Sequence, residues 1–190
     1  MIEKKFNPQK LERLNDPQRL IYLPPDHIWG KIAGENTDVL IDIGAGTGVF
    51  SKAFSDLSGG KAKIFACDIA DILLEWMEKN VCNDYPNIRT VKMPESSVPL
   101  DDNFADIVYM INLHHELDDP DEILKQCYRI LKVNGCVMVV DWRKEETDGG
   151  PPVEIRFYAD TVREQMTAAG FSDIRIFNDL PKHFIVIGRK

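Results

Sequence analysis

An aspartate followed by a glycine-rich turn is the segment of this chain best suited to holding a ligand. The stretch Val39–Ile43 is apolar except for Asp42, and Gly44, Gly46 and Gly48 follow it in a G-x-G-x-G pattern. Glycine has no Cβ, so such a turn lets a bulky ligand approach the backbone closely. A strand, a glycine-rich turn and then a helix are typical of nucleotide-type cofactor sites. The alternative is a tight strand–helix turn that binds nothing.

The same turn indicates which ligand charge would fit. A dinucleotide-binding G-x-G-x-x-G turn would place its third glycine at position 49, where this chain has Val49. Such turns bring a pyrophosphate to the helix N-terminus, and the Asp42 carboxylate would face that phosphate with like charge. The pattern therefore favours an amine-bearing or positively charged ligand.

A second acid closes the next expected strand, which covers Ala62–Cys67. An acid at the end of the second strand of a βαβ unit accepts hydrogen bonds from the ribose hydroxyls of an adenosine. Asp68 occupies that position and Ile69 follows it. The alternative is that Asp68 caps the next helix, since aspartate is favoured there.

Two adjacent histidines, His114 and His115, follow an apolar run that begins at Ala105. Histidine titrates near neutral pH and can take a proton from a hydroxyl, thiol or amine, so both are candidate catalytic bases. Successive strand residues face opposite sides, so at most one would face an acceptor. The alternative is that they pack or cap the turn before Pro120. The chain has no H-x-x-x-H spacing, and no metal site is expected.

Short β-branched runs alternate with helical patterns from Val39 onward, which predicts a parallel sheet. Strands are expected near 38–43, 62–67, 88–92, 105–112 and 135–141, and helices near 47–57, 71–82, 120–131 and 159–169. The last two strands, Ile174–Asn178 and Phe184–Gly188, are joined by so few residues that they must form an antiparallel hairpin.

Five blocks in this order resemble the class I S-adenosylmethionine-dependent methyltransferases, in particular the small-molecule group (methyltransferase type 11-like) with ubiquinone/menaquinone-biosynthesis-type and arsenite-type enzymes. The blocks are Val39–Gly48, Ile64–Ile69, Ala105–Leu117, Ile130–Trp142 and Ala168–Phe171. The resemblance covers roughly residues 36–190. It implies an α/β fold: a single Rossmann-like, doubly wound, mostly parallel seven-stranded sheet with an antiparallel last strand.

The resemblance also implies S-adenosylmethionine as cofactor and a set of residues that bind it. These are Asp42, Gly44, Ala45, Gly46, Gly48, Asp68, Ile69, Glu95, Ser96 and Asn112. One position departs from the family pattern. Family members commonly have an acidic residue that hydrogen-bonds the adenine amino group, and in this chain Pro94 occupies that position. Glu95 or Ser96 is therefore expected to make that contact, with Ile69 against the ring.

Composition limits the partners and the compartment. The chain has 190 residues, of which 23 are basic and 31 acidic, and a net charge of −8. Nucleic-acid binding needs a basic patch and none is visible in the sequence, so nucleic acid is not expected as a partner. The partner that the resemblance implies is a small-molecule methyl acceptor. No apolar run is long enough to span a membrane. The four cysteines form no C-x-x-C pair and are expected to be reduced, which suits the cytoplasm. Nothing in the pattern indicates an oligomeric state.

Two segments are candidates for the walls of an acceptor site. Residues 1–35 are polar, are interrupted by prolines and are expected to contain helices at Pro8–Leu14 and Pro25–Ala33, as a segment or lid beside a methyltransferase domain at 36–190. The loop Glu145–Pro152 follows the fifth strand at the edge where α/β sheets bind ligands. Each is equally compatible with a plain surface connection.

The sequence as a whole predicts a methyltransferase that acts on a small molecule not identified by these residues. Methyl transfer from a sulfonium mainly needs alignment of the nucleophile and exclusion of water, so the lack of an evident catalytic triad is compatible with it. The alternative is a non-catalytic protein that binds S-adenosylmethionine or S-adenosylhomocysteine. A nicotinamide-dependent oxidoreductase is disfavoured by the missing third glycine.

Overall fold

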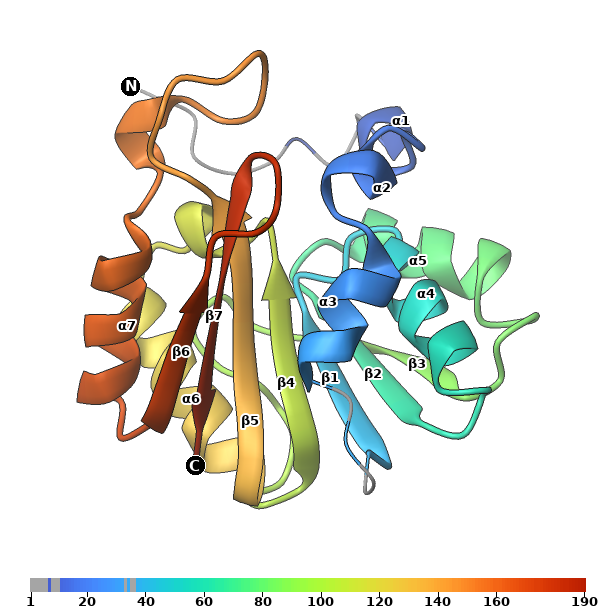
Figure 1. The fold of residues 1–190 in the computed structure, drawn as a ribbon. Helices are drawn as coiled ribbons and strands as arrows, with labels where there is room; N and C mark the ends of the chain where they lie inside the picture. Colours follow the sequence, from blue (N-terminus) through green and yellow to red (C-terminus); the bar gives the residue numbers. More distant parts are fainter. Residues whose placement is uncertain (1–6, 8–10, 33, 35–36) are drawn as a thin grey trace.

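A single seven-stranded sheet with helices on both faces forms the protein, as described by a computed structural model for residues 7, 11–32, 34 and 37–190 (Figure 1). The strands are β1 (Val39–Ile43), β2 (Lys63–Asp68), β3 (Ile88–Lys92), β4 (Ala105–Ile111), β5 (Leu131–Trp142), β6 (Ser172–Phe177) and β7 (His183–Arg189). The α-helices are α1 (Leu11–Leu14), α2 (Arg19–Tyr22), α3 (Pro25–Ile32), α4 (Val49–Leu57), α5 (Asp71–Asn80), α6 (Pro120–Ile130) and α7 (Ala159–Ala168). Short 3₁₀ helices cover His114–Glu116 (η1) and Val153–Ile155 (η2).

The strand order is β3-β2-β1-β4-β5-β7-β6, and every neighbouring pair from β3 to β5 is parallel. Only β7 runs in the opposite direction, antiparallel to both β5 and β6. This topology confirms the predicted fold class, including the antiparallel last strand. The order reverses between β1 and β4, and open α/β sheets bind ligands beside such a switch point, at the carboxyl ends of the strands.

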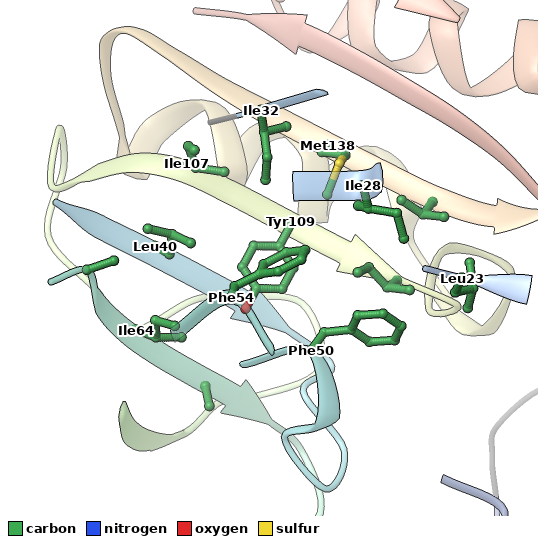
Figure 2. Packing of buried hydrophobic residues seen from close by; sticks show 14 of the residues in the cluster. Leu23, Ile28, Ile32, Leu40, Phe50, Phe54, Ile64, Ile107, Tyr109 and Met138 are labelled. Carbon is green, nitrogen blue, oxygen red and sulfur yellow. The ribbon is translucent and has the colours of Figure 1, made fainter. Parts of the chain in front are cut away.

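One face of the sheet packs on α3, α4 and α5. Its buried cluster includes Ile28 from α3, Phe54 from α4 and Tyr109 from β4 (Figure 2). The rings of Phe54 and Tyr109 meet edge to face, with centroids 4.9 Å apart. Leu23, which links α2 to α3, is buried in the same cluster. The N-terminal segment is therefore fixed to the domain through its second half.

The opposite face packs on α6 and α7, and strand periodicity divides the side chains between the two clusters. Along β4, Ile107 and Tyr109 join the first cluster, whereas Val108 and Met110 join the second. This alternation is the period of two expected of a strand whose two faces are both covered.

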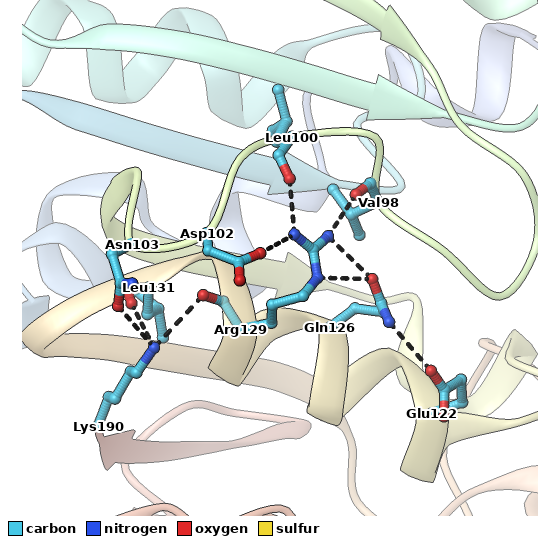
Figure 3. A network of polar contacts seen from close by, with 9 residues as sticks. All are labelled: Val98, Leu100, Asp102, Asn103, Glu122, Gln126, Arg129, Leu131 and Lys190. Atoms are coloured by element: carbon cyan, nitrogen blue, oxygen red, sulfur yellow. Dashed lines mark hydrogen bonds and ion pairs between the residues drawn. The ribbon is translucent and has the colours of Figure 1, made fainter.

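A polar network ties the end of α6 to the loop before β4 (Figure 3). Arg129 donates to the carbonyl oxygens of Val98 and Leu100 at 2.7 and 2.8 Å and pairs with Asp102 at 2.6 Å. Lys190 donates to the Leu131 carbonyl oxygen at 2.9 Å. Since β5 begins at Leu131, these contacts lie at the amino edge of the sheet, away from the ligand edge.

Several boundaries differ from the sequence prediction. The fourth strand ends at Ile111, because Asn112 has a left-handed backbone (φ 58°) that stops the extended conformation. α2 was not expected. The predicted helix Pro25–Ala33 is observed as α3 up to Ile32, and residue 33 lies outside the described ranges. The predicted helix Pro8–Leu14 is observed only as Leu11–Leu14, since residues 8–10 lie outside the described ranges. Within those ranges no helix is both long and apolar enough to cross a membrane.

Candidate cofactor and active site

A cavity of about 850 Å³ opens at the carboxyl edge of the sheet. This volume lies within the usual range for sites of small molecules and cofactors. Most of the expected site residues line it, namely Asp42, Gly44, Ala45, Gly46, Asp68, Ile69, Glu95, Asn112 and His115. Three do not: Gly48, Ser96 and His114 are absent from the lining.

The glycine turn between β1 and α4 has a backbone that only glycine adopts easily. Gly44, Gly46 and Gly48 have φ values of 70°, 60° and 72°. A Cβ added to Gly44 would lie 2.6 Å from Leu113, and one added to Gly48 would lie 2.5 Å from Met77. Gly48 thus shapes the turn from behind the cavity wall. The turn is preformed and accepts little substitution.

Asp68 ties this turn to the end of β2. Its carboxylate accepts from the Gly46 amide at 2.9 Å and from the Ala70 amide at 2.9 Å, and the residue is buried. Burial raises the pKa of Asp68, against these backbone hydrogen bonds, which lower it. Asp68 also lines the cavity, so the same carboxylate can support the glycine turn and contact a bound ligand.

Asp42 is buried beneath the turn and accepts from the Ser51 hydroxyl of α4 at 2.6 Å. Burial raises its pKa to about 7, although the Ser51 hydrogen bond opposes the shift. Arg19 of α2 also lines the cavity, and its positive charge lowers the pKa of Asp42. Sequence reasoning did not single out Arg19, which stands in a polar stretch that looks like surface.

Four buried polar atoms of cavity-lining residues have no hydrogen-bond partner among the described residues: the Asn112 Oδ1, the Thr47 Oγ1 and both ring nitrogens of His183. An unpaired buried polar atom costs roughly 1–3 kcal/mol, so such atoms beside a cavity are expected to receive a ligand. Asn112 directly follows β4 and has a left-handed backbone. Its backbone N–H donates to the Val140 carbonyl oxygen at 2.8 Å.

The residues expected at the adenine are Glu95 or Ser96, with Ile69. Glu95 and Ile69 line the cavity, and the buried Met93 lines it too. Ser96 is exposed and is not part of the lining. Of the two expected contacts, only Glu95 is therefore placed at the cavity.

His115 and Asp141 form a buried pair at the same edge. The His115 Nδ1 lies 2.7 Å from the Asp141 Oδ1, and the His115 backbone amide donates to the Asp141 Oδ2 at 2.9 Å. Burial lowers the pKa of His115, but the Asp141 charge and hydrogen bond outweigh it, so that the pKa is raised. The Asp141 pKa is lowered: His115 outweighs the burial, which by itself raises it.

Asp141 is a site residue that sequence reasoning missed. Asp141 is the penultimate residue of β5. Because β5 pairs with β4 in parallel, the end of β5 lies beside the residues that follow β4. The available signal was an acid closing an otherwise apolar strand. That signal becomes specific only when the pairing of the two strands is known.

His114 is turned away from the cavity. It is fully buried, its Nε2 lies 2.9 Å from the Gln165 Oε1 of α7, and its ring meets Phe157 edge to face at 5.0 Å. Burial lowers its pKa. The two histidines stand on the 3₁₀ turn η1 and not on a continued strand, and on this turn only His115 lines the cavity.

The loop after β5 forms one wall of the cavity through Gly150, Pro151 and Pro152. Its shape depends on Arg156, which is 3% exposed. The guanidinium donates to backbone carbonyl oxygens of Pro151, Glu145, Gly149 and Arg143 and lies 5.2 Å from the Trp142 ring centre. A basic residue in a charged loop gave no sequence signal for this role.

Residues 41–139 match the sequence profile of a family described as a methyltransferase domain, which is more than half of the chain. The chain belongs to this methyltransferase family. Among curated relatives, the ubiquinone/menaquinone biosynthesis C-methyltransferase of Idiomarina loihiensis is 28% identical over 108 residues, and that of Pseudoalteromonas translucida is 29% identical over 109 residues. These matches cover 55% and 56% of this chain but only 43% of each relative, so the chain spans less than half the length of these relatives.

Solved structures agree over almost the whole chain. A SAM-dependent methyltransferase from Aquifex aeolicus has a TM-score of 0.90 and 28% identity, with 97% of this chain and 98% of that one covered. A type 11 methyltransferase from Sulfolobus solfataricus, described as putative, has a TM-score of 0.71 and 28% identity, with 88% and 91% covered. The predictions of a class I methyltransferase and of S-adenosylmethionine as its cofactor are confirmed. Among the described residues, no group of histidine, cysteine and acidic side chains could hold a metal ion.

Proposed function

We propose that the chain methylates a small-molecule acceptor in this cavity and that His115, supported by Asp141, takes the proton of the acceptor. The observation that carries the proposal is the buried His115–Asp141 pair, of which His115 lines the same cavity as the glycine turn. The cavity extends past the turn to Trp142 and His183, which leaves room for an acceptor beside a cofactor. This extension favours an enzyme over a protein that only binds the cofactor.

The residues around the turn fit S-adenosylmethionine, since they combine a backbone that lacks Cβ atoms with unpaired buried polar atoms. We assign the ribose hydroxyls to Asp68, the adenine to Ile69 and Glu95, and the amino-acid end to Asp42 and Asn112. Glu95 replaces the acid that the family commonly has at the position of Pro94. When bound, the cofactor supplies an activated methyl group.

His115 is suited to proton transfer because Asp141 fixes its ring. With Nδ1 donating to the Asp141 carboxylate, the neutral ring keeps the lone pair of Nε2 for a proton from the acceptor. The raised pKa makes His115 a stronger base, and Asp141 stabilises the imidazolium that forms. His114, bound to Gln165, is assigned a packing role.

The test is transfer of labelled methyl from S-adenosylmethionine to a metabolite panel that begins with precursors of ubiquinone and menaquinone, because the names of the curated relatives place them in the biosynthesis of these compounds. On the acceptor found, His115→Ala should lose about 10²–10⁴-fold in turnover and still bind S-adenosylhomocysteine, whereas His114→Gln should keep most turnover. Turnover should fall as the pH drops and His115 is protonated. Asp141→Asn should shift this acid limb to lower pH. Near-normal turnover of His115→Ala would refute the assignment.

Three wider features are part of the proposal. The first is a division into an N-terminal helical segment at 1–35, of which residues 7, 11–32 and 34 are described, and a methyltransferase domain at 36–190; the position of α1 and α2 at the cavity supports it. The protein is cytoplasmic, supported by four free cysteines, and a native disulfide would contradict this. Nucleic acid is not the acceptor, supported by the net charge of −8, and methylation of RNA or DNA in the same assay would overturn it.

A further inference from the structure

Arg19 reaches the cavity from the side opposite the sheet. It begins α2, and both α1 and α2 contribute to the lining through Leu14, Arg19 and Tyr22. Leu14 lies directly over the glycine turn, because a Cβ added to Gly46 would be 3.2 Å from its Cδ1. The guanidinium therefore lies over the part of the cavity where the turn exposes its backbone.

Few described groups satisfy this guanidinium. Its Nη1 donates to the Leu14 carbonyl oxygen at 2.6 Å, and its Cζ lies 5.8 Å from the Phe50 ring centre. No described carboxylate is within ion-pair distance, although a guanidinium has five N–H donors arranged as a fork that matches a carboxylate. Arg19 is only partly exposed, and it lines the cavity.

Two carboxyl groups, those of Asp16 and Asp42, act electrostatically on Arg19. Burial lowers the pKa of Arg19, and the negative charges of Asp16 and Asp42 oppose that shift. In return, the positive charge of Arg19 lowers the pKa of Asp42. The cavity lining thus includes a cation from the N-terminal segment and the carboxyl group of Asp42 from the sheet. The amino-acid end of S-adenosylmethionine carries the matching pair, a carboxylate and an ammonium.

We propose that Arg19 binds the carboxylate of the cofactor's amino-acid end while Asp42 faces its ammonium, so that the bound cofactor links the N-terminal segment to the sheet. The inference rests on the S-adenosylmethionine dependence of the chain and not on the identity of the acceptor. It adds a cofactor-binding residue that stands outside the glycine turn and outside the matched methyltransferase range of residues 41–139.

The experiment compares two ligands by calorimetry, S-adenosylhomocysteine and its decarboxylated analogue S-adenosyl-3-thiopropylamine. Arg19→Met should lower the affinity for S-adenosylhomocysteine by about 10- to 100-fold, which is the effect expected when hydrogen bonds to a charged group are lost. The same variant should change affinity for the decarboxylated analogue by less than about threefold. Arg163→Met, which removes an arginine paired with Asp160 on α7, is the matched control and should leave both affinities unchanged.

Equal losses for both ligands in Arg19→Met, or no loss for S-adenosylhomocysteine, would overturn the proposal. Failure of the unmodified protein to bind either ligand would instead contradict the cofactor assignment, so the two failures are distinguishable. Hydrogen exchange supplies the second readout. S-adenosylhomocysteine should protect the amides of residues 11–22 in the unmodified protein, and the decarboxylated analogue should not. Equal protection by both ligands would overturn the link between the carboxylate and this segment.

Discussion

The cavity has two walls of different construction, the loop from Arg143 to Arg156 and the segment of α1 and α2. The first is held by a buried arginine that satisfies several backbone carbonyl groups of the same loop. The second has no buried residue in either helix, and Arg19 offers donors to the cavity that its own segment does not use. Arginine thus completes one wall by itself, whereas in the other wall it depends on a ligand.

Contacts at the rim connect the two walls. In the turn between β6 and β7, Asp179 pairs with Lys31 of α3 at 2.6 Å. In the same turn Lys182 pairs with Asp148 of the loop at 2.5 Å and lies 4.1 Å from the ring centre of Tyr22 in α2. The exposed partners make these contacts weak individually, so each wall should respond separately to mutation.

The largest expected effect is on the stability of the fixed wall. Arg156→Met should lower the free energy of unfolding by about 2–4 kcal/mol, because it leaves buried carbonyl groups without a donor. Arg19→Met should change it by less than about 0.5 kcal/mol, as for an ordinary surface position. Urea denaturation measures both. A cost for Arg19→Met as large as that for Arg156→Met would remove the distinction between the walls.

The next effect concerns Asp68, which lines the cavity at the end of β2. Asp68→Ala should weaken the binding of S-adenosylhomocysteine by about 1.5–3 kcal/mol, because the substitution removes a carboxylate that supports the glycine turn and is proposed to bind the ribose. Asp71→Asn, at an exposed ion pair with Lys92, is the control. Calorimetry with a folded Asp68→Ala variant that binds as well as the unmodified protein would place the ribose contact elsewhere.

The smallest expected effect is a pH dependence of the free energy of unfolding that comes from Asp42. Because burial raises the pKa of Asp42 to about 7, the folded state holds an extra proton between the ordinary aspartate pKa of about 4 and this value. Stability contributed by Asp42 therefore falls as the pH rises through this window. Asp42→Asn should gain stability relative to the unmodified protein over the same window and level off above it, while binding S-adenosylhomocysteine less tightly near neutral pH.

Thermal unfolding of the two proteins across this range, without ligand, checks the sign. A difference in stability that is constant with pH would show that Asp42 does not titrate there. A difference in affinity that disappears at low pH, where both proteins are neutral at this position, would support the proposed contact with the ammonium.

The sequence predicted features that depend on neighbours along the chain. The glycine turn, the acid at the end of β2 and the antiparallel hairpin are each encoded within a short stretch, and the predicted fold class, family and cofactor are confirmed. The roles of the individual site residues stay predictions. Alternation along a continued strand was the wrong basis for separating His114 from His115, because the left-handed backbone of Asn112 ends the strand before them.

The features that the sequence did not reveal depend on long-range pairing. His115 and Asp141 are 26 residues apart and meet only because β4 and β5 are neighbours. Arg19 and Arg156 both stand in polar surroundings in the sequence, where arginine is usually exposed. Arg156 is buried and Arg19 lines the cavity because of how the two walls fold over the sheet, and a local pattern contains no record of that arrangement.

The direction of β7 has a practical consequence. Because this strand alone runs opposite to the others, its first residue, His183, reaches the cavity and its end leads to Lys190 at the far edge of the sheet (Figure 1). A fluorescent reporter or an immobilisation tag fused after Lys190 would therefore leave from the edge opposite the cavity. Surface-attached protein would present its ligand mouth to solution, which suits optical measurements of cofactor exchange.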